Sequence, residues 1–295
     1  MTLAAGSDFR RGALLVGAAA LVWSFGGVIV RTVAIQDSWT IVFWRSVFAA
    51  LFVLGFMIVR NGLAGALAEL GRTRLAGIAV ALCFATASVS FVVALSHTTV
   101  ANVALIGAGV PLFAALLSWL LFRETVSPAT WLAIGGVILG VAIMVSGSLG
   151  GTVSPVGDGL ALLIALVFST AAVITRHNPQ VSMVPAVLIG TAMAGILAAT
   201  QASKLTVSTP DLLLLAAFGS LNLGMGLALF VTGARLMPAA AATLIGMLEP
   251  ALAPVWVWLA YDETPAPRTL LGGVAIVAAL VFHIIVEWKT QARRR

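Results

Sequence analysis

The chain has 295 residues, of which 61% are hydrophobic and only 9% are charged, and its formal net charge is +6. Soluble domains carry roughly 25% charged residues, so this composition excludes a soluble globular protein and indicates an integral membrane protein. The basic excess does not indicate a nucleic-acid partner, because the basic residues lie between apolar stretches and serve to orient them. The single cysteine, Cys83, excludes a disulfide framework.

Ten apolar stretches follow one another along the chain, each close to the ~20 residues that cross ~30 Å of hydrocarbon as a helix. We predict transmembrane helices over residues 12–34, 39–59, 74–96, 98–122, 127–147, 157–177, 182–201, 211–234, 238–260 and 267–287. The first stretch resembles a signal peptide but lacks a persuasive cleavage site, so we expect it to be retained as a helix. The predicted fold is an all-α polytopic membrane protein.

One pattern occurs twice in the sequence. Residues 101–124 align with 240–263 at an offset of 139, and residues 12–31 align with 157–176 at an offset of 145. Matched pairs include Gly12 and Gly157, Ser24 and Ser169, Arg31 and Arg176, Leu105 and Leu244, Gly107 and Gly246, Pro111 and Pro250, and Glu124 and Glu263. The turn-rich linker at 146–157 separates the copies. We therefore predict two units of five helices, residues 1–148 and residues 149–295.

An odd number of helices in each unit means that the second unit is inverted relative to the first. Inverted repeats around one central site are how many secondary transporters are built. The positive-inside rule gives the orientation: of 16 Lys and Arg residues, twelve fall on the side of the N-terminus and three, Arg31, Lys204 and Arg268, on the other. We predict that both termini are cytoplasmic.

Motifs for other kinds of function are missing from the sequence. The loops are too short for a soluble catalytic domain, and there is no GxxxxGK[ST] nucleotide-binding motif, no HExxH zinc motif and no pair of intramembrane aspartates. We therefore expect no enzyme activity, no cofactor and no metal ion.

Glu249 stands about midway through the ninth span, where a carboxylate is costly and marks a candidate functional site. Pro250 follows it and interrupts the helix ladder near Gly246, and the repeat partner of Glu249 is Val110. Two interpretations are open. Glu249 either carries a proton or contacts a substrate amine, or it is a protonated acid that bonds a carbonyl across the kink.

Three further polar residues lie inside the predicted spans. Arg45 either binds an acidic group or a substrate carboxylate, or extends along the second span to the headgroups. Asn102 and Asn222 either hold a polar group of a substrate or bond a neighbouring helix.

The two halves together resemble a known family. Each half has a proline midway through its fourth span and a glutamate at the end of it, the second span begins Phe43-Trp44-Arg45, and glycine pairs stand at 135–136 and 272–273. These features resemble the drug/metabolite transporter superfamily of the EamA type. The chain is most similar to the bacterial aromatic amino acid and metabolite exporters of the YddG type.

The resemblance implies a central substrate cavity lined mainly by helices three, four, eight and nine. Mapped by position, it singles out Trp23, Phe84, Ser90, Phe91, Asn102, Asn222, Thr243 and Glu249. It also implies export of amino acids across the bacterial inner membrane. Because the only tyrosine, Tyr261, lies at a span end, we expect a broader range of neutral amino acids than aromatic ones alone.

The function predicted from repeat and resemblance together is secondary transport by alternating access, with Pro111 and Pro250 as hinges of the two gates. The expected partners are a small-molecule substrate, the lipid bilayer and, as a candidate coupling ion, the proton; we expect a monomer. Two alternatives are open: a membrane-embedded lipid-handling protein or enzyme without solute transport, and a passive channel.

Overall fold

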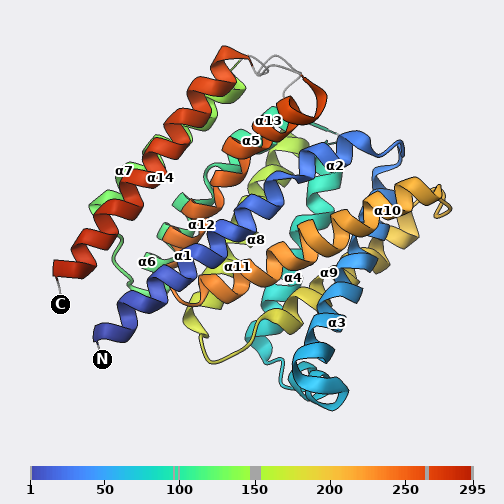
Figure 1. Cartoon of the computed structure of the whole chain (residues 1–295), viewed down its shortest axis with the longest axis horizontal. Helices are drawn as coiled ribbons and strands as arrows, with labels where there is room; N and C mark the ends of the chain where they lie inside the picture. The colour runs from blue at the N-terminus through green and yellow to red at the C-terminus, as the bar shows by residue number, and fades with distance from the viewer. Residues whose placement is uncertain (1, 96, 99, 147–153, 263–265, 294–295) are drawn as a thin grey trace.

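The computed structural model describes residues 2–95, 97–98, 100–146, 154–262 and 266–293 (Figure 1). The regular structure in these residues is helical throughout. The elements in chain order are α1 (Thr2–Ser24), α2 (Gly26–Thr32), α3 (Ser38–Gly71), α4 (Leu75–Leu95), α5 (Val100–Gly107), α6 (Val110–Phe122), α7 (Pro128–Val145), α8 (Pro155–His177), α9 (Val184–Gln201), α10 (Thr209–Ala217), the π-helix η1 (Phe218–Met225), α11 (Gly226–Ala234), α12 (Ala239–Gly246), α13 (Leu248–Tyr261) and α14 (Pro267–Arg293).

These helices account for all ten predicted membrane segments. Within the described residues, nine segments are apolar helices of at least 18 residues, and the third segment contains a shorter apolar helix, Leu75–Phe91. The prediction of an all-α polytopic membrane protein is confirmed. The first, fourth, eighth and ninth segments each consist of more than one helix, namely α1–α2, α5–α6, α10–η1–α11 and α12–α13.

The end of the second segment differs from the sequence prediction. We expected this helix to stop at residue 59, but α3 continues to Gly71 through a break at Gly62, whose φ of 70° and ψ of 168° are not helical. The residues after Gly62 are mostly alanine and leucine, which are strong helix formers. A helix therefore resumes directly after the glycine. The sequence prediction ended at residue 59 because it looked for stretches of about the length that crosses a membrane.

Prolines account for the interruptions in the fourth and ninth segments. Pro111 and Pro250 have no N–H to donate, and each ring crowds the carbonyl four residues before it, at Gly107 and Gly246. The helices α5 and α12 end at these two glycines. The helices that follow also end alike, on non-glycine residues in the left-handed conformation, Arg123 and Asp262, which are 139 positions apart as in the sequence repeat.

The start of α3 is fixed by Asp37. Its carboxylate accepts hydrogen bonds from the backbone N–H of Trp39 at 3.0 Å, the hydroxyl of Thr40 at 2.9 Å and both the N–H and the hydroxyl of Ser203 at 2.8 and 2.7 Å. Burial opposes the charge of Asp37, but the bonds from Ser203, Thr40 and Trp39 outweigh it and lower the pKa of Asp37 to about 2. This carboxylate therefore ties the beginning of α3 to the loop after α9.

The helices of the two halves pack against one another in related pairs. The corresponding segments contact each other directly, α3 with α9, α6 with α12 and α7 with α14, and the last pair lies side by side at one edge of the bundle (Figure 1). Other contacts occur twice, once for each half. The contact of α4 with α8 corresponds to that of α11 with α1, and the contact of α4 with α9 corresponds to that of η1 with α3. The two chain ends lie at the same end of the bundle (Figure 1).

Small residues allow the closest of these approaches. A Cβ added to Gly272 of α14 would meet the carbonyl oxygen of Gly140 and lie 2.7 Å from the backbone nitrogen of Met144 in α7. Backbone packing of this kind is typical of membrane helices. Lipid provides no hydrophobic driving force for helix association, so small residues let the backbones approach and gain van der Waals contacts.

We therefore predict that Gly272→Ala destabilises the protein by roughly 1–3 kcal/mol, because α7 and α14 must separate to admit a methyl group. The measurement is the thermal unfolding midpoint of purified protein in detergent. Gly135→Ala on α7 is the matched control, since a Cβ there meets nothing within 4 Å. Equal midpoints for the two variants would contradict the proposed backbone contact.

Candidate functional site

A cluster of four aromatic side chains joins both halves of the protein. Trp23 of α1 lies 6.1 Å from Phe168 of α8 and 5.5 Å from Phe230 of α11, measured between ring centroids. Phe168 in turn lies 6.0 Å from Phe84 of α4 and 5.1 Å from Phe230. Phe84 and Phe230 are only 5% and 1% exposed. The four rings therefore fill the space where α1, α4, α8 and α11 meet.

The cluster follows the sequence repeat. Trp23 and Phe168 are 145 positions apart, the offset found for the first part of each half, and Phe84 and Phe230 are 146 apart. Each half thus contributes one ring from its first and one from its third segment. Sequence reasoning named Trp23 and Phe84 but missed Phe168, which the offset applied to Trp23 would have found.

Trp23 is held in this cluster by η1 and α11. A Cβ on Gly226 would collide with the indole of Trp23, so the ring lies directly against the backbone at Gly226. The side-chain amide of Asn222 donates to the carbonyls of Val22 at 2.7 Å and Trp23 at 3.0 Å. These carbonyls precede the break between α1 and α2 at Phe25, so the amide of Asn222 satisfies backbone groups that the break leaves open.

Ser24 connects the same break to the ninth segment. Its hydroxyl accepts a hydrogen bond from Nε1 of Trp256 at 2.8 Å and donates to the carbonyl of Leu21 at 2.6 Å. Phe25 stacks on Trp256 with ring centroids 4.5 Å apart. The repeat counterpart of Ser24, Ser169, lies within hydrogen-bond distance of the Val110 carbonyl at 2.9 Å. Both serines therefore link the first segment of one half to the fourth segment of the other.

Glu249 lies in the first turn of α13, directly after the break at Met247, and is partly buried. Among the residues that the structure describes, none forms a hydrogen bond or an ion pair with its carboxylate. A bond to a carbonyl across the kink, the purely structural alternative, is not found in this part of the chain. Glu249 is thus a carboxylate within a predicted span that has no partner in the described part of the chain.

The other residues expected in the cavity have varied surroundings. Thr243 is buried and bonds the carbonyls of Ala239 and Ala240 in its own helix at 2.9 and 3.1 Å. Ser90 is buried on α4, whereas Phe91 is 38% exposed. Asn102 belongs to α5, but its side chain lies outside the described residues. The structure therefore places Trp23 and Phe84 in the aromatic cluster and Asn222 beside Trp23, and a cavity lined by all eight residues stays a prediction.

Arg45 points into the helix bundle. Its Nη2 donates to the hydroxyl of Ser88 on α4 at 3.0 Å, and the centre of the guanidinium lies 5.2 Å from the centroid of the Phe218 ring in η1. Nε is buried without a hydrogen-bond partner. The side chain is thus packed among three helices, which disagrees with the alternative that it extends to the headgroups.

The end of the fourth segment contacts the end of the sixth. The carboxylate of Glu124 lies 3.7 Å from Nε of Arg176 and 3.8 Å from Nε2 of His177. The His177 ring stacks on Phe122 with ring centroids 3.5 Å apart and planes inclined by 11°.

A related contact stands at the opposite end of the bundle. The hydroxyls of Thr32, at the end of α2, and Tyr261, at the end of α13, are 2.6 Å apart. Tyr261 is 139 positions after Phe122, and His177 is 145 positions after Thr32. The same pair of repeat positions therefore touches at both ends of the bundle.

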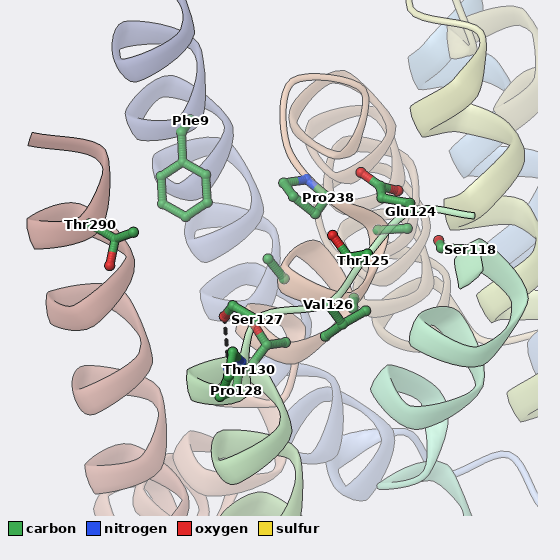
Figure 2. A pocket seen from close by; sticks show the side chains of 13 residues that line it. Phe9, Ser118, Glu124, Thr125, Val126, Ser127, Pro128, Thr130, Pro238 and Thr290 are labelled. Atoms are coloured by element: carbon green, nitrogen blue, oxygen red, sulfur yellow. Dashed lines mark hydrogen bonds between the residues drawn. The ribbon is translucent and has the colours of Figure 1, made fainter. Parts of the chain in front are cut away.

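A cavity of about 520 Å³ opens at the end of the bundle where the chain begins and ends. Figure 2 shows it between α1, α14, the start of α12 and the loop from Glu124 to Pro128. Glu124 contributes to its wall, as does Ser118, whose hydroxyl is buried without a partner. Of the eight residues predicted for a central cavity, none of the seven whose side chains the structure describes lines it.

The chain belongs to the EamA-like transporter family, whose model matches residues 10–146 and again residues 155–285. This confirms the family suggested by the sequence motifs and assigns the protein to transporters of small solutes. The crystal structure of another protein superposes on this chain with a TM-score of 0.80. The superposition covers 94% of this chain and 97% of the other chain, and the two sequences are 17% identical. That likeness shows the fold alone. No curated protein matches the sequence.

We predict that Asn222→Ala destabilises the protein by about 1–3 kcal/mol, because the Trp23 carbonyl loses the amide donor and the Val22 carbonyl keeps only the long bond from the N–H of Phe25 at 3.4 Å. Thermal unfolding in detergent measures the effect. Ser220→Ala in the same π-helix is the control, since in the described structure its hydroxyl donates to the carbonyl of Phe48 at a long 3.4 Å. A midpoint for Asn222→Ala no lower than that of Ser220→Ala would show that the amide does not support the break.

Proposed function

We propose that this protein is a secondary transporter that exports neutral amino acids, aromatic ones included, or related small metabolites across the bacterial inner membrane. The proposed mechanism is alternating access in a monomer. The observation that carries the proposal is the pair of end contacts, in which one pair of repeat positions meets at each end of the bundle. Family membership supports small-solute transport, and the narrower assignment to exporters of the YddG type rests on the sequence resemblance.

We propose further that residues 1–148 and 149–295 are inverted repeats, with both termini cytoplasmic. The double match of the family model to 10–146 and 155–285 supports the duplication. The related helix contacts between the halves and the equal caps at Arg123 and Asp262 support it as well. Inversion follows from five membrane segments in each half, and the distribution of basic residues supports the orientation.

In the proposed cycle the two end contacts open in turn. Separating Phe122 and Glu124 from Arg176 and His177 opens the cytoplasmic end, and separating Tyr261 from Thr32 opens the other. In this cycle α6 and α13, the parts of the fourth and ninth segments that carry the end contacts, tilt at the breaks near Pro111 and Pro250. The helix bends there most easily because its hydrogen-bond ladder is incomplete. Such rocking of one half against the other around a fixed site is common in transporters with inverted repeats.

The substrate site of this proposal lies between the aromatic cluster and Glu249. The rings of Trp23, Phe84, Phe168 and Phe230 offer an apolar surface to a neutral side chain, contributed by both halves. Glu249 either accepts the amino group of the substrate or carries the coupling proton, and each role requires an ionisable carboxylate without a fixed protein partner.

The experiment that tests this function is counterflow of radiolabelled amino acids in proteoliposomes, with and without an imposed pH gradient. Saturable exchange of neutral amino acids would support the proposal, and a response to the gradient would identify protons as the coupling ion. Lipid scrambling without solute exchange would favour the lipid-handling alternative, and flux that never saturates would favour a channel.

We predict that Glu249→Gln reduces counterflow about 10-fold or more, because the variant keeps the shape of the side chain but loses the charge-assisted bond or the proton site. The same substitution at Glu69, which hydrogen-bonds Asn61 outside the predicted spans, should leave transport unchanged. Normal transport by Glu249→Gln across the whole pH range would remove both proposed roles.

We predict that cross-linking the cytoplasmic end stops transport. In a Cys83→Ser background, Phe122→Cys and His177→Cys place two thiols where the two rings now stack. Joining them with a short bifunctional thiol reagent that carries a disulfide should abolish most of the counterflow, and reduction should restore it. Each single-cysteine variant treated in the same way is the control. Full transport by completely cross-linked protein would show that this end does not need to open.

A further inference from the structure

We propose that the guanidinium of Arg45 binds the carboxylate of the transported substrate. This inference rests on the transport function proposed above and narrows its substrates to zwitterions and monocarboxylates. It starts from the position of Arg45 in the second turn of α3, where its side chain reaches α4 and η1 rather than the edge of the bundle.

The protein satisfies this cation only in part. A guanidinium has five N–H donors. In the described structure one of its nitrogens, Nη2, donates to the hydroxyl of Ser88, its central carbon lies over the Phe218 ring at 5.2 Å from the centroid, and Nε is buried with no acceptor. No Asp or Glu of the described chain ion-pairs with it.

An unpaired charge in a membrane interior is costly, and such residues normally find an opposite charge or line a substrate path. Arginine presents planar, paired donors that match the two oxygens of a carboxylate, and such charge-assisted pairs are about twice as strong as neutral hydrogen bonds. The ring of Phe218 and the hydroxyl of Ser88 hold the guanidinium plane without neutralising it. The site therefore suits an anionic group that the described residues do not supply.

Arg45 and Glu249 carry opposite charges within the membrane segments, and among the described residues neither is ion-paired with the other or with a third residue. The incompletely bonded guanidinium gives a physical reason for a substrate that carries a carboxylate, such as an amino acid, rather than an amine or a sugar.

The test compares Arg45→Gln with wild type in two assays. The first is competition in counterflow by three forms of one transported amino acid: the free acid, its carboxamide and its N-acetyl derivative. In wild type the carboxamide should compete about 10- to 100-fold less well than the free acid, as expected for a lost hydrogen bond to a charged group. In Arg45→Gln the free acid should weaken to the level of the carboxamide. Arg45→Lys, which keeps the charge, should retain part of the preference.

Two variants of Ser88 keep the proposal testable if Arg45→Gln folds poorly. Ser88→Ala removes the hydroxyl that helps to hold the guanidinium but leaves its charge, so it should reduce the preference for the free acid without abolishing it. Ser88→Asp places an internal carboxylate beside Arg45, so it should abolish that preference while leaving the folded protein intact in size-exclusion chromatography.

The second assay is thermal stabilisation of the purified protein by the same compounds and by chloride and phosphate, which needs no transport. Stabilisation by the free acid that is lost in Arg45→Gln, without any flux in liposomes, would uphold the carboxylate site and refute the transport function. Flux in which Arg45→Gln keeps the wild-type preference for the free acid would refute the carboxylate site alone. Equal stabilisation by chloride, phosphate and the free acid, or none by any of them, would also overturn it.

Discussion

The hydrocarbon of a membrane offers no hydrogen bonds, so every interruption of a helix must find its partners inside the protein. In the described residues the first, fourth and ninth segments are each interrupted between two helices. The amide of Asn222 bonds the two carbonyls before the break in the first segment. Ser169 of α8 lies within hydrogen-bond distance of the Val110 carbonyl and so links α8 to the start of α6, beside the break in the fourth. The breaks are therefore specific joints between named helices, and the surrounding packing depends on them.

The sequence predicted the membrane segments well because lipid thickness imposes their length and apolar character. All ten predicted spans coincide with helices to within a few residues at most of their ends. Two features escaped this reasoning for physical reasons. The helix after Gly62 follows from local preferences of alanine and leucine rather than from membrane span length, and the π-helix at Phe218–Met225 has no signature in hydropathy.

The candidate site was less predictable, because hydropathy does not say which face of a helix meets which neighbour. Glu249 stood out from the sequence as a rare intramembrane acid, and Trp23 and Phe84 were named by resemblance. Phe168 was missed although the repeat offset places it opposite Trp23. The partners of Arg45 and Asn222 required the packing of η1 against α1 and α3, since the residues involved are far apart in the chain.

The two described end contacts occupy equivalent places but differ in chemistry. One joins an acid to two basic groups and stacks two rings, whereas the contact described at the other end joins two hydroxyls. A carrier whose two closures differ in strength has unequal resting populations of its two open forms. Gradients still fix the thermodynamic direction of flux, but the apparent affinity and maximal rate then differ between the two faces. In the alternating-access cycle proposed above, the repeat would supply the symmetry for access from both sides, and the difference between its end residues would make the kinetics of flux unequal at the two faces.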